Sequence, residues 1–363
     1  MSNHFRALAI VGPLPPPRHG LSAVNEAVRE LSTRNGAQVV CYDTAAASLD
    51  RSISVRFGRV RRLLSAARGV INLSQTRKVT VYLSLSGGYG LLWEASIARL
   101  ARRAGVRLIV HHHSFRYLDS PFWPMRQLVR AAGPEALHVV LCDAMGKKLR
   151  ERYSQVGRTL VLSNVAWLDA APSKIASKDE LRNVGYLSNL SSDKGMMDVL
   201  NLADFAQHRA KNLRFTIAGP FEQPAEEIRF WARARKLTNI DYLGAVYGAD
   251  KERFFREADA FVFPTRYRHE AEPLVALEAL RFGCPIIAFG RGCIGSIIDE
   301  KSGAVLQVGS DFQEGAWPLL EKWSRAPESF VAARGAAAAR YLSMQEAAQT
   351  GKAQFLRELL SAL

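Results

Sequence analysis

Short apolar runs alternate with amphipathic stretches along both halves of this sequence, and this alternation limits the fold more than any other feature. The stretches between the runs carry apolar residues at helical spacing, as in residues 22–32 and 91–103. Strands that alternate with helices form parallel sheets covered by helices, so the sequence predicts an α/β fold. The predicted strands are 7–11, 38–42, 79–83, 108–112, 137–142 and 159–162 in the first half, and 183–187, 214–218, 240–243, 260–263, 285–288 and 304–308 in the second.

An aperiodic segment rich in alanine and serine, residues 169–179, separates the two sets of predicted strands and is expected to be a linker. A chain of 363 residues is long enough for two domains of ordinary size. We therefore predict two α/β domains, the first over residues 1–170 and the second over residues 171–344.

The positive charge lies in the first half of the chain. The whole sequence has a net charge of +15; residues up to Val165 contain 24 Lys and Arg against 9 Asp and Glu, whereas the rest contains 25 of each kind. This asymmetry indicates an anionic partner for the first half, such as nucleic acid, a membrane surface or an acidic substrate, although a solvated basic surface is the alternative. Because no apolar run has the length of a transmembrane helix or of a signal peptide, we expect a cytoplasmic protein.

The segment 264–280 is the most informative loop. It follows an apolar strand, and a helix is predicted to begin near Pro273, a residue suited to a first helical turn. A helix N-terminus leaves backbone N–H groups free to bind an anion. Glu270 and Glu278 flank this terminus, and carboxylates suit the hydroxyl groups of ribose or of a sugar ring. The alternative is that acidic residues here only favour the helix dipole.

In this loop the chain resembles the retaining glycosyltransferases of family 4, which have the GT-B fold. Their signature is Glu-x7-Glu after a strand that ends in Phe-Pro-Ser/Thr, followed by Glu-Ala and Gly-x-Pro-Val-Ile. The chain departs from the family after the first glutamate, where Ala271-Glu272-Pro273 replaces the common Gly-Phe-Gly. The matching residues are Phe263-Pro264-Thr265, Glu270, Glu278-Ala279 and Gly283-Cys284-Pro285-Ile286-Ile287. The resemblance implies two Rossmann-like domains whose parallel sheets face a central cleft, with the C-terminal helix 345–363 belonging to the first domain.

The resemblance also implies a donor site. Lys194 would place a positive charge on a diphosphate, whereas the family's arginine five positions earlier is Asn189 here and supplies no charge. Gly20 stands where the family has Gly-Gly before the first helix, and it would let the backbone approach the ligand. The predicted donor-binding residues are Gly20, Asn189, Lys194, Glu270, Ala271, Glu272, Pro273, Leu274, Val275 and Glu278.

Three consecutive histidines, His111, His112 and His113, end the fourth predicted strand. Side chains alternate along a strand, so His112 is expected on the opposite face from the other two, and no further ligands follow at metal-binding spacing. We therefore predict no metal site. In the resembling family a histidine here contacts the transferred sugar; His113 fits best and is predicted to be catalytic with Glu270 and Lys194. His19 and His112 are assigned to the acceptor side.

The implied reaction is retaining transfer from a nucleoside-diphosphate sugar, without metal or other cofactor, in which Lys194 and the helix N-terminus stabilise the departing diphosphate. A basic helix predicted over residues 56–73 and an aromatic loop at residues 121–126 suit an anionic lipid surface.

We therefore predict a peripheral enzyme on the inner face of the cell membrane. Its acceptor would be a glycan or a lipid-linked sugar in the synthesis of a bacterial surface polysaccharide, such as lipopolysaccharide, or of a glycolipid, and no nucleic-acid partner is expected. The alternatives are a nucleotide-sugar epimerase of GT-B fold and a non-enzymatic polyanion-binding protein.

Overall fold

The structure is a computed structural model that describes residues 7–16, 20–44, 65, 68–73, 79–173, 175, 177–210 and 212–360. The chain divides into two compact units, Met1–Trp167 with Ala347–Leu363, and Leu168–Glu346. Each unit contains a six-stranded parallel sheet covered by helices, as the alternating pattern predicts.

The first sheet has the strand order β2-β1-β3-β4-β5-β6. Its strands are β1 (Ala7–Gly12), β2 (Gln38–Asp43), β3 (Val79–Ser84), β4 (Arg107–His111), β5 (Leu137–Val140) and β6 (Arg158–Val161). The helices of this unit are α1 (Gly20–Arg34), α3 (Leu91–Arg103), α4 (Arg116–Asp119), α5 (Trp123–Ala132) and α6 (Asp143–Arg152), with a 3-10 helix, η1 (Asn164–Trp167). Strands β1 and β3 are buried along their whole length because helices cover both faces of the sheet.

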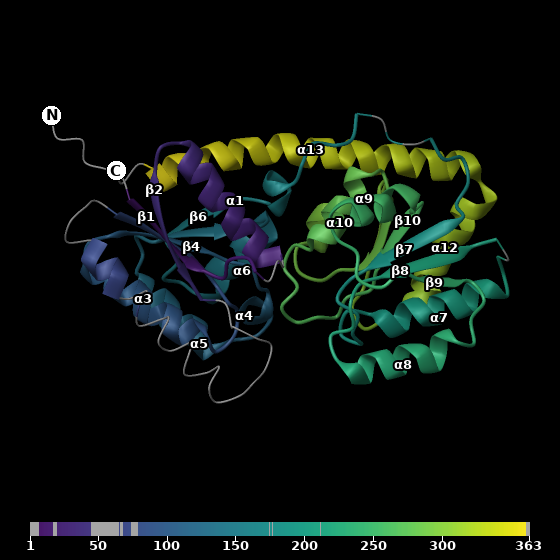
Figure 1. Ribbon diagram of the computed structural model, residues 1–363, viewed down its shortest axis with the longest axis horizontal. Coiled ribbons are helices and arrows are strands. Elements are labelled where there is room, and N and C mark those ends of the chain that lie inside the picture. Colours follow the sequence, from purple (N-terminus) through teal and green to yellow (C-terminus); the bar gives the residue numbers. More distant parts are fainter. Residues whose placement is uncertain are drawn as a thin grey trace. The chain divides into compact units, whose positions relative to one another are not determined.

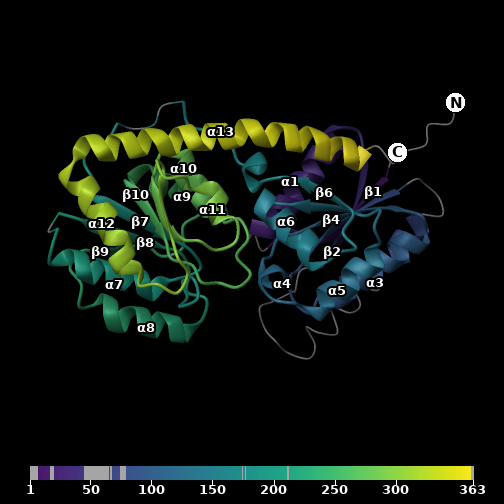
Figure 2. The same cartoon turned by 180° about the vertical axis from the view of Figure 1, so that it is seen from behind.

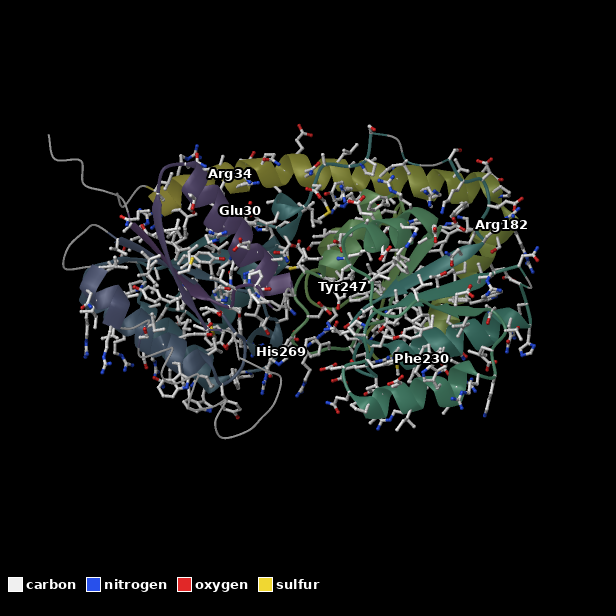
Figure 3. All side chains as sticks on the ribbon, in the orientation of Figure 1. Glu30, Arg34, Arg182, Phe230, Tyr247 and His269 are labelled. Carbon is white, nitrogen blue, oxygen red and sulfur yellow. The ribbon has the colours of Figure 1, made fainter. Side chains whose placement is uncertain are left out.

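Helices α3 and α5 lie side by side on one face of this sheet, and α1 lies on the other (Figure 1). Helix α1 buries Val24 and Val28 and exposes the ion pair between Glu30 and Arg34 (Figure 3). Ser22 is buried in the first turn of α1, which begins at Gly20.

The second sheet has the order β12-β11-β10-β7-β8-β9. Its strands are β7 (Asn183–Leu187), β8 (Arg214–Ala218), β9 (Ile240–Tyr242), β10 (Ala260–Phe263), β11 (Ile286–Phe289) and β12 (Gly303–Leu306). The helices are α7 (Met196–Gln207), α8 (Pro224–Ala234), α9 (Gly248–Glu257), α10 (Leu274–Arg281), α11 (Ile294–Ile297) and α12 (Phe312–Arg325).

Helices α7, α8 and α12 cover one face of the second sheet and α10 covers the other (Figure 2). Phe230 points from α8 toward the sheet, where its ring packs against Phe221 and Tyr242 (Figure 3). No helix in the described part of the chain is both long and apolar enough to cross a membrane.

The last helix, α13, runs from Pro327 to Leu360 and is longer than the helix predicted over 345–363. The N-terminal part of α13, which was not predicted, is rich in alanine. Alanine is the strongest helix former, so it extends the helix although no apolar stripe marks this part in the sequence. Residues from Ala347 onward belong to the first unit, where the ring of Phe355 contacts those of Tyr82, His111 and Trp167.

Candidate functional site

Two loops meet in the second unit at the point where the strand order reverses. Strands β7 and β10 are adjacent and parallel, so the loops after them leave the same edge of the sheet, where ligands bind in open α/β sheets. The loops are in contact: the N–H of Arg266 donates to the carbonyl oxygen of Asp193 at 2.8 Å. Gly195, with φ +86°, approaches so closely that a Cβ atom would lie 2.3 Å from the carbonyl oxygen of Pro264.

Lys194 and Glu270 form an ion pair across these loops. Nζ of Lys194 lies 2.7 Å from Oε2 of Glu270, and the hydroxyl of Thr265 donates to the same oxygen at 3.2 Å. The ammonium also lies 4.3 Å from the centre of the Tyr267 ring, within range of a cation–π contact. The two charged side chains are 18% and 10% exposed, so the pair is largely enclosed and still reachable from solvent. The structure thus brings together two of the predicted catalytic residues.

Residues after β11 hold the Glu270 loop from its other side. The guanidinium of Arg291 donates to the carbonyl oxygens of Tyr267 and Arg268 at 3.2 and 3.0 Å. Gly292 has φ +61°, and a Cβ atom there would lie 2.3 Å from the carbonyl oxygen of Ala271. The backbone that carries Glu270 is therefore fixed by contacts on two sides.

The turn from Glu270 into α10 contains the other predicted donor-binding residues of this loop. Pro273 is the N-cap, with extended ψ of 121°, and the helix begins at Leu274, so proline precedes the first turn rather than lying in it. The turn residues Ala271, Glu272 and Pro273 are buried. Leu274 and Val275, at the helix N-terminus, are partly exposed.

Glu278 lies in α10 and pairs with Lys251 of α9. Nζ of Lys251 is 2.7 Å from Oε1 and 2.6 Å from Oε2 of Glu278, so both carboxylate oxygens face one ammonium. No local sequence pattern points to Lys251, because the two residues come from separate helices and no motif joins them. Arg291 was missed for the same reason, since it follows a different strand. Thr265 lies in the matched motif and Tyr267 in the loop of Glu270, but their contacts with Glu270 and Lys194 are visible only in the structure.

Asn189 is exposed in the loop after β7, close to the ends of two neighbouring strands. Gly219, with φ +124°, follows β8, and a Cβ atom there would lie 1.7 Å from the carbonyl oxygen of Ser188. The N–H of Gly219 donates to the carbonyl oxygen of Gly244 at 2.7 Å. The loops after β7, β8 and β9 therefore pack against one another beside Asn189.

The histidines of the first unit divide between two sides of the chain, as the alternation predicts. Nδ1 of His111 lies 2.7 Å from the Tyr82 hydroxyl, and the His111 and His113 rings are 4.0 Å apart. The ring nitrogens of His112 instead lie 2.9 Å from the Tyr117 hydroxyl and 2.9 Å from Nδ1 of His138. Because both nitrogens of buried His112 are engaged inside the unit, its contacts favour a structural role over the predicted acceptor contact.

Burial keeps these histidines neutral. Desolvation lowers the pKa of His113 to about 3 and that of His138 to about 4, and it lowers the pKa values of His111 and His112 well below the ordinary range. Nε2 of His113 is buried and has no hydrogen-bond partner among the described residues. His113 is thus an uncharged imidazole whose Nε2 is enclosed by the protein.

Several predicted features lie elsewhere or outside the described residues. Gly20 is the exposed first residue of α1, and His19 and most of the predicted basic helix 56–73 fall outside the described ranges. The prediction that residues 121–126 form a loop is wrong in part, because α5 begins at Trp123 and Pro124 lies in its first turn. Within the described ranges, no group of three or more His, Cys, Asp and Glu side chains is arranged to hold a metal ion.

Comparison with known proteins gives this geometry its context. Residues 169–326, which include both contacting loops, match the family model of glycosyl transferases group 1. Over 125 residues the chain is 31% identical to the O-antigen chain mannosyltransferase C of Escherichia coli, an alignment that covers 34% of this chain and 33% of that protein. The matched segment therefore spans about a third of the length of this curated relative.

Solved structures of similar architecture cover nearly the whole chain. Sucrose-phosphate synthase from Thermosynechococcus elongatus has a TM-score of 0.72 at 14% identity, covering 99% of this chain and 100% of that one. HepE of Anabaena in complex with UDP and glucose has a TM-score of 0.70 at 17% identity, covering 98% and 99%. The fold is the GT-B fold, and the family match over the second unit supports a GT-B glycosyltransferase.

Proposed function

We propose that the protein is a retaining glycosyltransferase of family 4 that transfers a sugar from a nucleoside-diphosphate sugar to a glycan or lipid-linked acceptor. The observation that carries this proposal is the Lys194–Glu270 pair, at the edge of the second sheet where its strand order reverses and within the segment that matches the glycosyl transferases group 1 model. The pair brings a cation suited to a diphosphate beside a carboxylate suited to sugar hydroxyls.

Each proposed role follows from the chemistry of the side chain. Lys194 and the N-terminus of α10 stabilise negative charge on the leaving diphosphate, which needs no metal ion. Glu270 orients the donor sugar, and Glu278, held by Lys251, accepts hydrogen bonds from the ribose. Asn189 adds a neutral hydrogen-bonding group, and Gly20 allows a close backbone approach.

His113 is the proposed contact of the first unit to the transferred sugar. Its uncharged ring supports this role, since a neutral imidazole donates or accepts a hydrogen bond without adding positive charge. We expect His113→Ala to lower turnover and His208→Ala, at an exposed position of the second unit, to leave it unchanged.

The nature of the donor and of the product is proposed from the relatives. HepE of Anabaena was crystallised with UDP and glucose, and the partial match to a mannosyltransferase of O-antigen chains suggests a surface polysaccharide as product. We propose that the acceptor is a glycan or a lipid-linked sugar, used on the inner face of the cell membrane.

A thermal-shift panel tests the donor site. UDP-, GDP-, ADP- and TDP-sugars and their free diphosphates are added in turn to wild type and to Lys194→Ala, with Lys236→Ala as the control for loss of one exposed lysine. A ligand that binds only the folded protein raises the melting midpoint. We expect one base to be selected, the shift to be lost in Lys194→Ala and the control to behave as wild type.

Transfer is then measured with the selected donor. Sugar transferred to a glycan or lipid-linked acceptor with retained anomeric configuration supports the proposal, whereas an epimerised nucleotide sugar would identify an epimerase instead. A flat panel, combined with steeply salt-dependent binding to polyanions, would overturn the transferase proposal in favour of a polyanion-binding protein.

A further inference from the structure

One outer surface of the first unit combines exposed aromatic rings with unpaired arginines. It is formed by α3 and α5, which lie side by side on the same face of the first sheet (Figure 1). We define it as the α3–α5 surface. It is distinct from the Lys194–Glu270 site, which belongs to the second unit, and from the predicted helix 56–73.

Aromatic side chains gather at the N-terminal ends of the two helices. Tyr89, Trp93 and Trp123 are 61%, 42% and 54% exposed, which is unusual for rings of this size. The Tyr89 ring meets that of Phe122 edge-on, with centroids 5.5 Å apart, and so joins the start of α3 to the start of α5. The Arg116 guanidinium lies 4.7 Å from the centre of the Phe122 ring. These contacts join Tyr89, Phe122 and Arg116 into one cluster, and Trp123 follows Phe122 directly in the chain.

The charges along both helices have a single sign. Exposed arginines follow the aromatic residues along both helices. On α5, Trp123, Arg126 and Arg130 are spaced so that they lie on one stripe, and on α3 the arginines Arg99 and Arg103 are neighbours one turn apart. Glu94, the only acidic residue of the two helices, is buried and accepts a hydrogen bond from the N–H of Ser86. These four arginines form no ion pair with any described residue.

We infer that the α3–α5 surface binds an anionic phospholipid bilayer. This inference deepens the proposed function, because the choice of a membrane as partner rests on the proposed lipid-linked acceptor. Tryptophan and tyrosine favour the boundary between headgroups and acyl chains because the ring is apolar and its N–H or O–H is polar. Arginines can keep their guanidinium groups at the phosphates while their stems cover apolar surface. The rings and the charges therefore suit the two layers of a membrane surface.

Charge complementarity favours a bilayer over a protein partner. The surface offers only positive charge, and anionic headgroups attract basic residues within about a Debye length. A nucleic acid would also be attracted to the arginines, but its binding would not need Trp93 and Trp123 to enter an apolar layer. The tryptophans therefore distinguish the two kinds of partner.

Vesicle flotation of the full chain tests the surface. Wild type is mixed with phosphatidylcholine vesicles that contain or lack phosphatidylglycerol, and the same measurement is made on Trp93→Ala/Trp123→Ala and on Arg126→Gln/Arg130→Gln. Matched controls are Tyr247→Ala, which removes a 68% exposed ring (Figure 3), and Arg235→Gln/Lys236→Gln, which removes two exposed charges; both lie in the second unit. Because all substituted side chains are exposed, we expect unchanged melting curves.

The expected result is binding that requires phosphatidylglycerol, falls at least about tenfold in each α3–α5 variant and stays at the wild-type level in both controls. Loss of binding in the controls as well would indicate diffuse charge and overturn the inference. Equal binding to an oligonucleotide, insensitive to the tryptophan change, would also overturn it. A protein that floats with vesicles but transfers no sugar refutes only the proposed function, and an active transferase that ignores vesicles refutes only this surface.

Discussion

Nζ of Lys194 and Oε2 of Glu270 lie 2.7 Å apart, although the two residues are separated by 76 positions in the chain. Each follows a different strand, and the reversal of strand order makes those strands neighbours. The cation and the carboxylate therefore pair directly with one another. A diphosphate sugar that binds here would exchange this contact for contacts of Lys194 with phosphate and of Glu270 with hydroxyl groups.

Glu270→Gln tests the carboxylate directly. The amide has nearly the same shape but no charge, so it neither orients Lys194 nor accepts as strongly from sugar hydroxyls. We expect turnover to fall by about a hundredfold or more, on the scale found when one charge-stabilising group is removed from an active site. Turnover is measured with the selected nucleotide sugar, beside a melting curve.

The matched control for this change is Glu180→Gln, which removes a carboxylate from the exposed pair with Arg182 in the same unit. Near-normal turnover in Glu270→Gln, or an equal loss in Glu180→Gln, would contradict the assignment of Glu270.

Arg266 is expected to position Lys194 and Glu270. Its backbone N–H binds the residue before Lys194, and its guanidinium pairs with Asp198 in the first turn of α7 and lies 4.5 Å from the centre of the Phe289 ring. Arg266→Gln should therefore lower kcat by about tenfold with little change in KM, because misplacement costs most in the transition state. Steady-state kinetics with varied donor measures both constants.

Arg233→Gln is the control for this prediction. Arg233 also pairs with an aspartate of α7, Asp204, and is 37% exposed against 35% for Arg266, but within the described residues no side-chain hydrogen bond or ion pair joins it to either loop. If Arg266 acts through Glu270, the two losses should not add in the double variant Arg266→Gln/Glu270→Gln. Additive losses would refute a positioning role.

The fold was predictable because burial of the strands determines both the spacing and the length of the apolar runs in the sequence. Strands β1 and β10 are enclosed on both faces and therefore read as uninterrupted apolar runs. Helix ends were harder to predict. Pro273 fits a first turn and an N-cap equally well by composition, and α13 begins at Pro327 without an apolar stripe to mark it.

The candidate site was predictable only where one segment carries its own motif. Glu270 lies just before α10 and Glu278 lies within it, so both belong to one segment and their spacing is visible in the sequence. Lys251 meets Glu278 from another helix, and no local pattern encodes that meeting. His112 shows the same limit: its alternation was foreseen, but its enclosure between Tyr117 and His138 depends on two other segments.

Gly195→Ala tests the close approach of the two loops. At φ +86° an alanine is strained, and its Cβ atom would collide with the carbonyl oxygen of Pro264. We expect the free energy of unfolding to fall by about 1–3 kcal/mol and the donor-induced thermal shift to disappear. Gly335→Ala is the control, because a Cβ atom in that part of α13 meets nothing within 4 Å. The control should gain up to about 1 kcal/mol from better helix propensity, and equal losses in both variants would exclude a special role for Gly195.

The buried histidines predict that the first unit loses stability in mild acid. Burial lowers the pKa of His138 to about 4 from an ordinary 6.5. Below 6.5 the unfolded chain therefore binds a proton that the folded chain excludes until about 4. Stability is fully present above pH 6.5 and is lost as the pH falls through this window, by about 2 kcal/mol at about pH 5 from His138 alone.

Urea denaturation at neutral pH and at about pH 5 measures this loss. His138→Gln should be less stable at neutral pH, because it disturbs the contact with His112, but it should lose less on acidification since no imidazole remains to be protonated at that position. His208→Gln changes an exposed histidine of the second unit and should keep the full pH dependence of wild type. A His138→Gln profile parallel to that of wild type would show that carboxylates, and not the enclosed imidazole, cause the acid sensitivity.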